Sequence, residues 1–160
     1  MSHPTLSREE VLDRLMQVFR DYGYDGASLS RIADATGLGR SSLYHYFPKG
    51  KDDMAAAVLA HAGEFVRDNV LAPLNADGTP RERLVKLAQG LDALYASGRS
   101  ACLTNVLTMG DAAGKFTPQL RERLRRLIGA LAKVAQEGGV DEEAARQQAE
   151  DVMIALHGAL

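Results

Sequence analysis

The chain has 160 residues, of which 46% are apolar and 25% charged, with 19 basic against 21 acidic side chains and a formal net charge of -2. This length suffices for one compact domain or two small ones. The near balance of charge excludes a general polyanion binder, so any contact with DNA needs a local group of basic residues. Residues 1–10 lack the apolar core of a signal peptide, and no apolar run is long enough to span a bilayer. We therefore expect a soluble, cytoplasmic protein with no membrane partner.

Helical signals begin at the N-terminus and continue along the chain, with no alternating strand pattern. Ser7 and Glu10 form a predicted capping box at the start of the first helix. Tyr22–Gly26 is the predicted helix end and turn, because glycine takes the left-handed cap conformation. The inner face of this first helix is predicted to consist of Val11, Leu12, Leu15, Met16, Val18, Phe19 and Tyr22.

Residues 28–47 have the pattern of a helix-turn-helix. Ser28 is a predicted cap for the second helix, Gly37 a predicted stop, and a third helix is expected from about Gly39 to Phe47. Leu43 and Phe47 lie four residues apart, so both are expected on the inner face of the third helix. Its outward residues are then Arg40, Ser41, Ser42, Tyr44, His45 and Tyr46. Such a set of hydrogen-bonding side chains suits contact with base edges in a major groove.

This stretch resembles the DNA-binding signature of TetR-family transcriptional regulators. The matching positions are Ile32, Ala33, the small residues 35–37, Leu43, Tyr44 and Phe47. Gly39 stands where the family often has a Ser or Thr cap, so we expect a weaker cap there. Residues 47–54 are one residue longer than the common form and are similar to the LmrA/YxaF-like branch. The resemblance covers about the first third of the chain and thins beyond residue 70.

The resemblance implies an all-α protein with two domains. Residues 1–50 would form a three-helix DNA-binding domain, and residues 51–160 a helical domain for effector binding and dimerisation. The implied protein is a homodimeric regulator of a near-palindromic, double-stranded DNA operator. It would be a repressor that a small apolar effector releases from DNA. Family members usually carry a further C-terminal helix, so either this chain is short for its family or the natural protein extends past Leu160.

Basic and polar residues around the third helix are the candidates for DNA contact. Arg40 suits a bidentate contact with guanine, and the alternative is a solvated arginine. Tyr44 could pack on sugar or a thymine methyl, or be partly buried, with neither alternative favoured. Lys51 suits a phosphate contact, with Lys49 as its competitor because the loop is longer here. The predicted DNA-binding residues are Ser28, Arg40, Ser41, Ser42, Tyr44, His45, Tyr46, Lys49 and Lys51.

The second half of the chain continues in helical segments. A fourth helix is expected from about Asp52 to Val70, with Met54, Val58, Ala62, Phe65 and Val66 on its inner face. Further helices are expected from Pro80 through Leu84 to Tyr95, from Thr117 to Gly138, and from Asp141 to the terminus. Apolar and aromatic residues in this half would by default be core. By resemblance they could line an effector pocket formed by Phe65, Leu91, Tyr95, Cys102, Leu103, Val106, Met109 and Phe116.

Other functional classes have weaker signals. The run Gly110–Lys115 has one residue too few between its glycines for a phosphate-binding loop, and no strand pattern precedes it. His61 and Glu64 lie one helical turn apart, but no third metal ligand is evident. We therefore expect a protein that binds no metal, uses no cofactor and is not an enzyme. Two rival hypotheses remain: a helical protein-interaction module that uses residues 40–46, and a small enzyme that uses His61 or His157.

Overall fold

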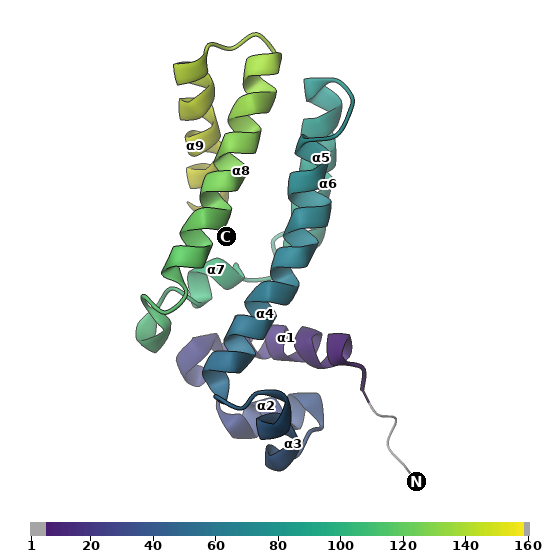
Figure 1. Ribbon diagram of the computed structural model, residues 1–160, viewed down its shortest axis with the longest axis vertical. Coiled ribbons are helices and arrows are strands. Elements are labelled where there is room, and N and C mark those ends of the chain that lie inside the picture. Colours follow the sequence, from purple (N-terminus) through teal and green to yellow (C-terminus); the bar gives the residue numbers. More distant parts are fainter. Residues whose placement is uncertain (1–5, 159–160) are drawn as a thin grey trace. The chain divides into compact units, whose positions relative to one another are not determined.

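The computed structural model describes residues 6–158, and every regular element within that range is a helix (Figure 1). This confirms the predicted all-α class. The elements in chain order are α1 (Arg8–Gly26), α2 (Leu29–Thr36), α3 (Arg40–Tyr46), α4 (Lys51–Val66), the π-helix η1 (Arg67–Leu71), α5 (Ala72–Leu74), α6 (Pro80–Tyr95), α7 (Leu103–Val106), the 3₁₀-helix η2 (Gly110–Ala112), α8 (Thr117–Glu137) and α9 (Glu142–Gly158).

Local capping signals explain where several helices begin. The Ser7 hydroxyl accepts from the Glu10 amide at 3.2 Å, and the Glu10 carboxylate accepts from the Ser7 amide at 2.7 Å. Asp141 caps α9 by accepting from the Ala144 amide at 3.0 Å. Both predicted caps are therefore confirmed, because each depends only on residues within one helical turn. The predicted continuation of the last helix to Leu160 lies outside the described residues.

The end of α1 differs from the predicted simple turn. Gly23 has φ 67° and ψ -180°, which breaks the helix, but residues 24–26 then form a further helical turn. The Ala27 amide closes this turn by donating to the Gly23 carbonyl at 3.2 Å. Glycine tolerates the positive φ because it has no Cβ. The break turns Tyr24 inward, where it is buried, while Tyr22 remains half exposed.

Two compact units make up the chain. One comprises Met1–Ala62 with Leu103–Phe116, and the other Gly63–Cys102 with Thr117–Leu160. The division falls inside α4, and the predicted domain boundary at residue 50 stays a prediction. We refer to them below as the first and second units.

In the first unit, α1 packs against α2, α7 and η2. Its largest fully buried apolar side chains come from α1, α2, α3 and α4 and from the residue directly after α7: Leu15, Phe19, Ile32, Leu43, Met54, Val58, Leu59 and Leu107. The predicted inner face of α1 is confirmed except at Met16, which is half-buried, and Tyr22, which is 50% exposed. Periodicity placed Tyr22 correctly on the helix, but no apolar core covers its ring in the described residues. The phenol lies instead beneath the Arg31 guanidinium, whose carbon is 4.5 Å from the ring centroid.

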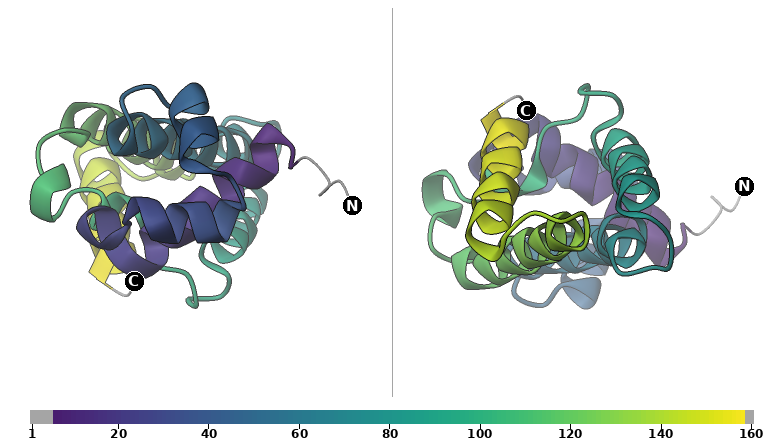
Figure 2. Two further views of the ribbon diagram at one scale, coloured as in Figure 1. Left: turned by 90° about the horizontal axis from the view of Figure 1, so that it is seen from below. Right: turned by 90° about the horizontal axis from the view of Figure 1, so that it is seen from above.

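The second unit has its own core, built mainly from α6, α8 and α9. Figure 2 shows the green α8 and yellow α9 side by side, joined at Gly138 and Gly139. The buried members of this core are Val70, Leu74, Leu87, Leu127, Leu131, Ala132, Val134, Ala145, Ala149 and Met153. Phe65 was predicted to face inward but is 37% exposed, and Leu84 of the predicted helix from Pro80 is 42% exposed.

The predicted fourth helix is not one continuous α-helix. After Val66 the chain widens into η1 before α5. The Asn69 side-chain amide donates to the Phe65 carbonyl at 3.1 Å. A side chain thus enters the series of backbone hydrogen bonds of the helix at this point. Asn69 also presents its own carbonyl to Gly90 of α6, where only glycine fits.

Candidate nucleic-acid interface

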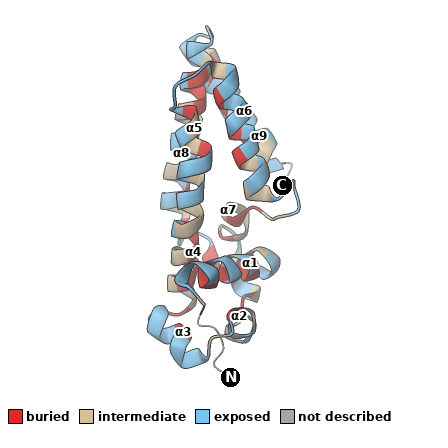
Figure 3. Cartoon of the chain, turned by 90° about the vertical axis from the view of Figure 1, so that its right-hand side faces the viewer, coloured by how far each residue is buried: buried red, intermediate tan, exposed pale blue. Residues whose placement is uncertain are grey.

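Helix α3 exposes nearly all of its polar side chains (Figure 3). Leu43 is fully buried and Phe47 is 3% exposed, so these two side chains anchor the helix. The residues predicted to face outward are all exposed: Arg40, Ser41, Ser42, Tyr44, His45 and Tyr46. Tyr44 and Tyr46 are 47% and 46% exposed, so neither phenol is buried. The face contains two potential cations and no carboxylate.

The turn before α3 is held by its own hydrogen bonds. Gly37 takes φ 69° and caps α2 by donating to the Ala33 carbonyl at 2.8 Å. The buried Thr36 hydroxyl donates to the Ile32 carbonyl at 2.7 Å and accepts from the Leu38 amide at 3.3 Å. Sequence reasoning missed Thr36, although a Thr directly before a helix-ending glycine is a typical turn signal.

Gly39 precedes α3 without any side-chain cap, as its lack of a side chain predicts. The first amides of α3 therefore have no protein side chain satisfying them at the cap position. Exposed helix N-terminal amides are favourable partners for an anion such as phosphate. Arg40 stands at this end of the helix.

The start of α2 presents a second helix N-terminus. The Ser28 hydroxyl accepts from the Arg31 amide at 3.3 Å, so its own proton is directed elsewhere and can be donated. The Arg31 guanidinium donates to the Gly26 carbonyl at 2.8 Å, which joins α2 to the end of α1. Arg14 of α1 donates to the Ala35 carbonyl at 3.2 Å. Sequence reasoning also missed these two arginines, whose partners lie on other elements.

Aromatic contacts stiffen the end of α3. The rings of His45 and Tyr46 meet edge to face with centroids 5.9 Å apart, and Tyr46 lies 6.3 Å from Phe47. Tyr44 lies against Gly50, where an added Cβ would sit 3.5 Å from its ring. These side chains are therefore exposed yet restrained, which lowers the entropy lost when they contact a partner.

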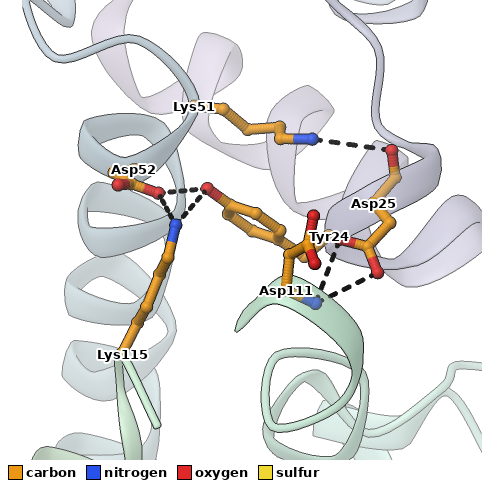
Figure 4. A network of polar contacts seen from close by, with 6 residues as sticks. All are labelled: Tyr24, Asp25, Lys51, Asp52, Asp111 and Lys115. Carbon is orange, nitrogen blue, oxygen red and sulfur yellow. Dashed lines mark hydrogen bonds and ion pairs between the residues drawn. The ribbon is translucent and has the colours of Figure 1, made fainter. Parts of the chain in front are cut away.

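A polar cluster around Tyr24 connects three segments of the first unit (Figure 4). The Tyr24 hydroxyl donates to the Asp52 carboxylate. The Lys115 ammonium lies 2.9 Å from Asp52 and 3.1 Å from the Tyr24 oxygen. Two ammonium groups also flank the ring, with Lys51 4.5 Å and Lys115 4.9 Å from its centroid. We call Tyr24, Lys51, Asp52 and Lys115 the Tyr24 cluster.

Charge coupling within this cluster shifts its titrations. Burial, and then the hydrogen bond with Asp52, raises the pKa of Tyr24. The hydrogen bonds from Lys115 and Tyr24 lower the pKa of Asp52, and the same contacts raise the pKa of Lys115. At neutral pH Tyr24 is therefore uncharged, Asp52 is negative and Lys115 is positive.

The predicted effector residues divide between the two units. Phe65, Leu91, Tyr95 and Cys102 belong to the second unit, and Leu103, Val106, Met109 and Phe116 to the first. Cys102 is buried beside the Tyr95 hydroxyl, with 3.7 Å between sulfur and oxygen. Met109 is 64% exposed and Phe116 packs near Tyr24. The effector pocket stays a prediction.

Residues 11–58 match the family described as "Bacterial regulatory proteins, tetR family". The matched residues contain all of α2 and α3 and the start of α4. Residues 11–58 therefore have the tetR-family sequence pattern. This confirms the resemblance identified from Ile32 to Phe47.

Curated relatives match mainly in this N-terminal part. The chain is 30% identical over 78 residues to YxaF of Bacillus subtilis, an uncharacterized HTH-type transcriptional regulator, covering 49% of this chain and 41% of that protein. It is 28% identical over 90 residues to the HTH-type transcriptional regulator LmrA of Bacillus subtilis, covering 56% and 48%. The chain thus spans less than half the length of these relatives, which are regulators rather than enzymes.

A solved structure with the same fold extends over the whole chain. It is CifR, a TetR family transcriptional regulator complexed with 26bp double-strand operator DNA, with TM-score 0.75 and 23% identity. The match covers 99% of this chain and 87% of CifR. The fold of this chain is therefore an N-terminal helix-turn-helix followed by a C-terminal helical part.

Two further features concern other functional classes. Within residues 6–158, no helix is both long and apolar enough to cross a membrane. The same range contains no group of three or more His, Cys, Asp or Glu side chains placed to hold a metal ion. His61 pairs with Asp13 at 2.8 Å.

Proposed function

We propose that this protein is a DNA-binding transcriptional regulator of the tetR family that inserts α3 into the major groove of its operator. The observation that carries the proposal is the exposed polar face of α3, backed by the buried Leu43 and Phe47. Such a helix can approach base edges while the rest of the unit stays rigid. Arg40 would contact guanine, and the hydroxyl and imidazole groups of α3 would contact bases, sugar or phosphate.

Local charge supports this proposal despite the net charge of -2. No acidic residue occurs between Gly37 and Lys51, a segment that contains Arg40, His45 and Lys49. The exposed start of α3 adds the partial positive charge of a helix N-terminus. A phosphate backbone would therefore be attracted to this part of the surface.

The proposed regulator acts as a homodimer on a near-palindromic operator. One copy of α3 covers only a few base pairs, so specific binding requires two copies about 34 Å apart, one turn of B-DNA. CifR, with the same fold, was solved with operator DNA. We further propose repression by occupancy of the operator, with release by a small apolar effector that binds the DNA-free form more tightly.

Selection of bound duplexes from a random pool tests the proposal. Enriched sequences should be two-fold symmetric, with half-sites about 10 base pairs apart. Affinity for the enriched duplex should fall with salt, with a logarithmic slope of about -0.9 for each phosphate neutralised. The proposal fails if no duplex is enriched and if the affinity for random duplex DNA does not change with salt. In that case α3 would serve another kind of partner.

Arg40→Ala tests the role of α3 directly. It should weaken the enriched duplex by about 1 to 3 kcal/mol per half-site while leaving random DNA nearly unchanged. The matched control is Arg81→Ala, which removes another exposed arginine, from α6 of the second unit. An equal loss on enriched and random DNA would make Arg40 a phosphate contact instead.

A further inference from the structure

Two lysines flank Gly50 between α3 and α4, and their surroundings differ. Lys51 is the first residue of α4 and is half-buried, whereas Lys49 is exposed. Both would lie beside α3 on the proposed DNA-binding surface. From sequence alone either ammonium could bind a phosphate, so the structure must discriminate between them.

Lys51 is already engaged within its own unit. Its ammonium lies 4.5 Å from the Tyr24 ring centroid and makes a long hydrogen bond of 3.5 Å to the Asp25 carbonyl. Figure 4 shows the Lys51 side chain extending towards the Asp25 carbonyl. The cation therefore faces the buried aromatic end of α1. Moving it to a phosphate would expose one ring face and leave that carbonyl without its partner.

Nearby carboxylates also compensate the Lys51 charge. Asp52 is the next residue, and the Lys51 charge contributes to the low pKa of its carboxyl. Lys115 and Asp52 form an ion pair at 2.9 Å beside the same ring. Lys51 is thus one of two cations in a group that contains its own anion, which reduces the attraction it can offer to DNA.

Lys49 has the opposite arrangement. Its backbone amide donates to the Asp53 carboxylate at 2.7 Å, which restrains the loop at this residue. Its side chain makes no hydrogen bond or ion pair within residues 6–158. Lys49 is exposed and lies two residues after Phe47 in the chain. Gly50, with φ 64°, reverses the chain between the two lysines and directs them differently. The held backbone and unengaged ammonium suit a phosphate contact.

We infer that Lys49 is the phosphate ligand at this junction and that Lys51 is a positioning residue acting through Tyr24. The inference rests on the proposed DNA-binding function and adds a role for each lysine. Lys51 joins the first turn of α4 to the end of α1 and so fixes where the loop carrying Lys49 ends. It retains its contact with Tyr24 when DNA is bound.

Salt dependence separates the two roles. Operator affinity of the wild type, Lys49→Met and Lys51→Met is measured by fluorescence anisotropy between about 50 and 200 mM salt. Lys49→Met should reduce the logarithmic salt slope by about 0.9 per protomer, or about 1.8 for the dimer. Lys51→Met should weaken binding about three- to tenfold at every salt concentration, with the slope unchanged. Its thermal midpoint should remain close to that of the wild type.

A second measurement follows Lys51 directly. The ε-methylene protons of Lys51 should show an upfield ring-current shift in NMR spectra because they lie over Tyr24. The shift should persist after operator is added. The matched signal from Lys49 should lack the upfield shift in free protein and should move when operator binds.

The outcomes distinguish this inference from the proposed function. If the wild type binds no duplex in a salt-dependent manner, both fail. If the wild type binds but Lys51→Met loses about 0.9 of slope per protomer, or the Lys51 shift disappears on DNA, only the inference fails. An unchanged affinity for Lys51→Met would also overturn its positioning role.

Discussion

Replacing Thr36 with valine would remove one hydroxyl from the turn between α2 and α3 while nearly preserving side-chain volume. Thr36 is fully buried, and its hydroxyl both donates to the Ile32 carbonyl and accepts from the Leu38 amide. Two neutral hydrogen bonds contribute about 1 kcal/mol each, and the added methyl group recovers about 0.8 kcal/mol by burial. We therefore expect Thr36→Val to reduce the free energy of unfolding by about 1 to 2 kcal/mol.

Urea denaturation followed by circular dichroism measures this change, and amide hydrogen exchange at Leu38 localises it. The exchange rate at Leu38 should rise in Thr36→Val because that amide loses its acceptor. The control is Thr104→Val in α7, whose half-buried hydroxyl makes no hydrogen bond among residues 6–158. Its effect should stay within about 0.5 kcal/mol. Equal unfolding free energies for the two variants, with Leu38 still protected, would refute this account of the turn.

Two further predictions concern other parts of the chain. Gly90→Ala should destabilise the second unit by about 1 to 3 kcal/mol, since the new Cβ would sit 2.0 Å from the Asn69 carbonyl oxygen. Its control is Gly129→Ala, where nothing lies within 4 Å of the new Cβ, and this variant should be stabilised by up to about 1 kcal/mol. Thermal unfolding compares the two variants. Because Lys115 lowers the pKa of Asp52 in the folded state, the stabilisation is present above about pH 4 and is lost as pH falls through the lowered pKa. The free energy of unfolding should therefore depend less on acid pH in Asp52→Asn than in the wild type. The same pH dependence in both proteins would contradict the pairing.

Features controlled by neighbouring residues were predictable. The capping box of Ser7 and Glu10, the stop at Gly37 and the start of α6 at Pro80 each involve one helical turn or less. The outward set on α3 followed from the four-residue spacing of Leu43 and Phe47, since two buried anchors orient a short helix completely.

Long-range placement was less predictable. Periodicity put Tyr22, Phe65 and Leu84 on apolar stripes, but whether such a residue is covered depends on the width of the helix packed against it. The π-helix after α4 likewise reflects Asn69 and its close approach to Gly90, residues 21 positions apart whose contact no local pattern encodes.

The sequence by itself determined that this protein is helical, where its main helices begin, and that residues 28–47 form a helix-turn-helix with a polar outer face. Those properties follow from hydrogen bonds and side-chain directions within a few residues. Only the tertiary structure decided that residues 103–116 fold with the first unit and that Lys51 lies over Tyr24 while Lys49 stays exposed. These outcomes depend on contacts between distant segments, which bring Lys115 to Asp52 across 63 positions of the chain.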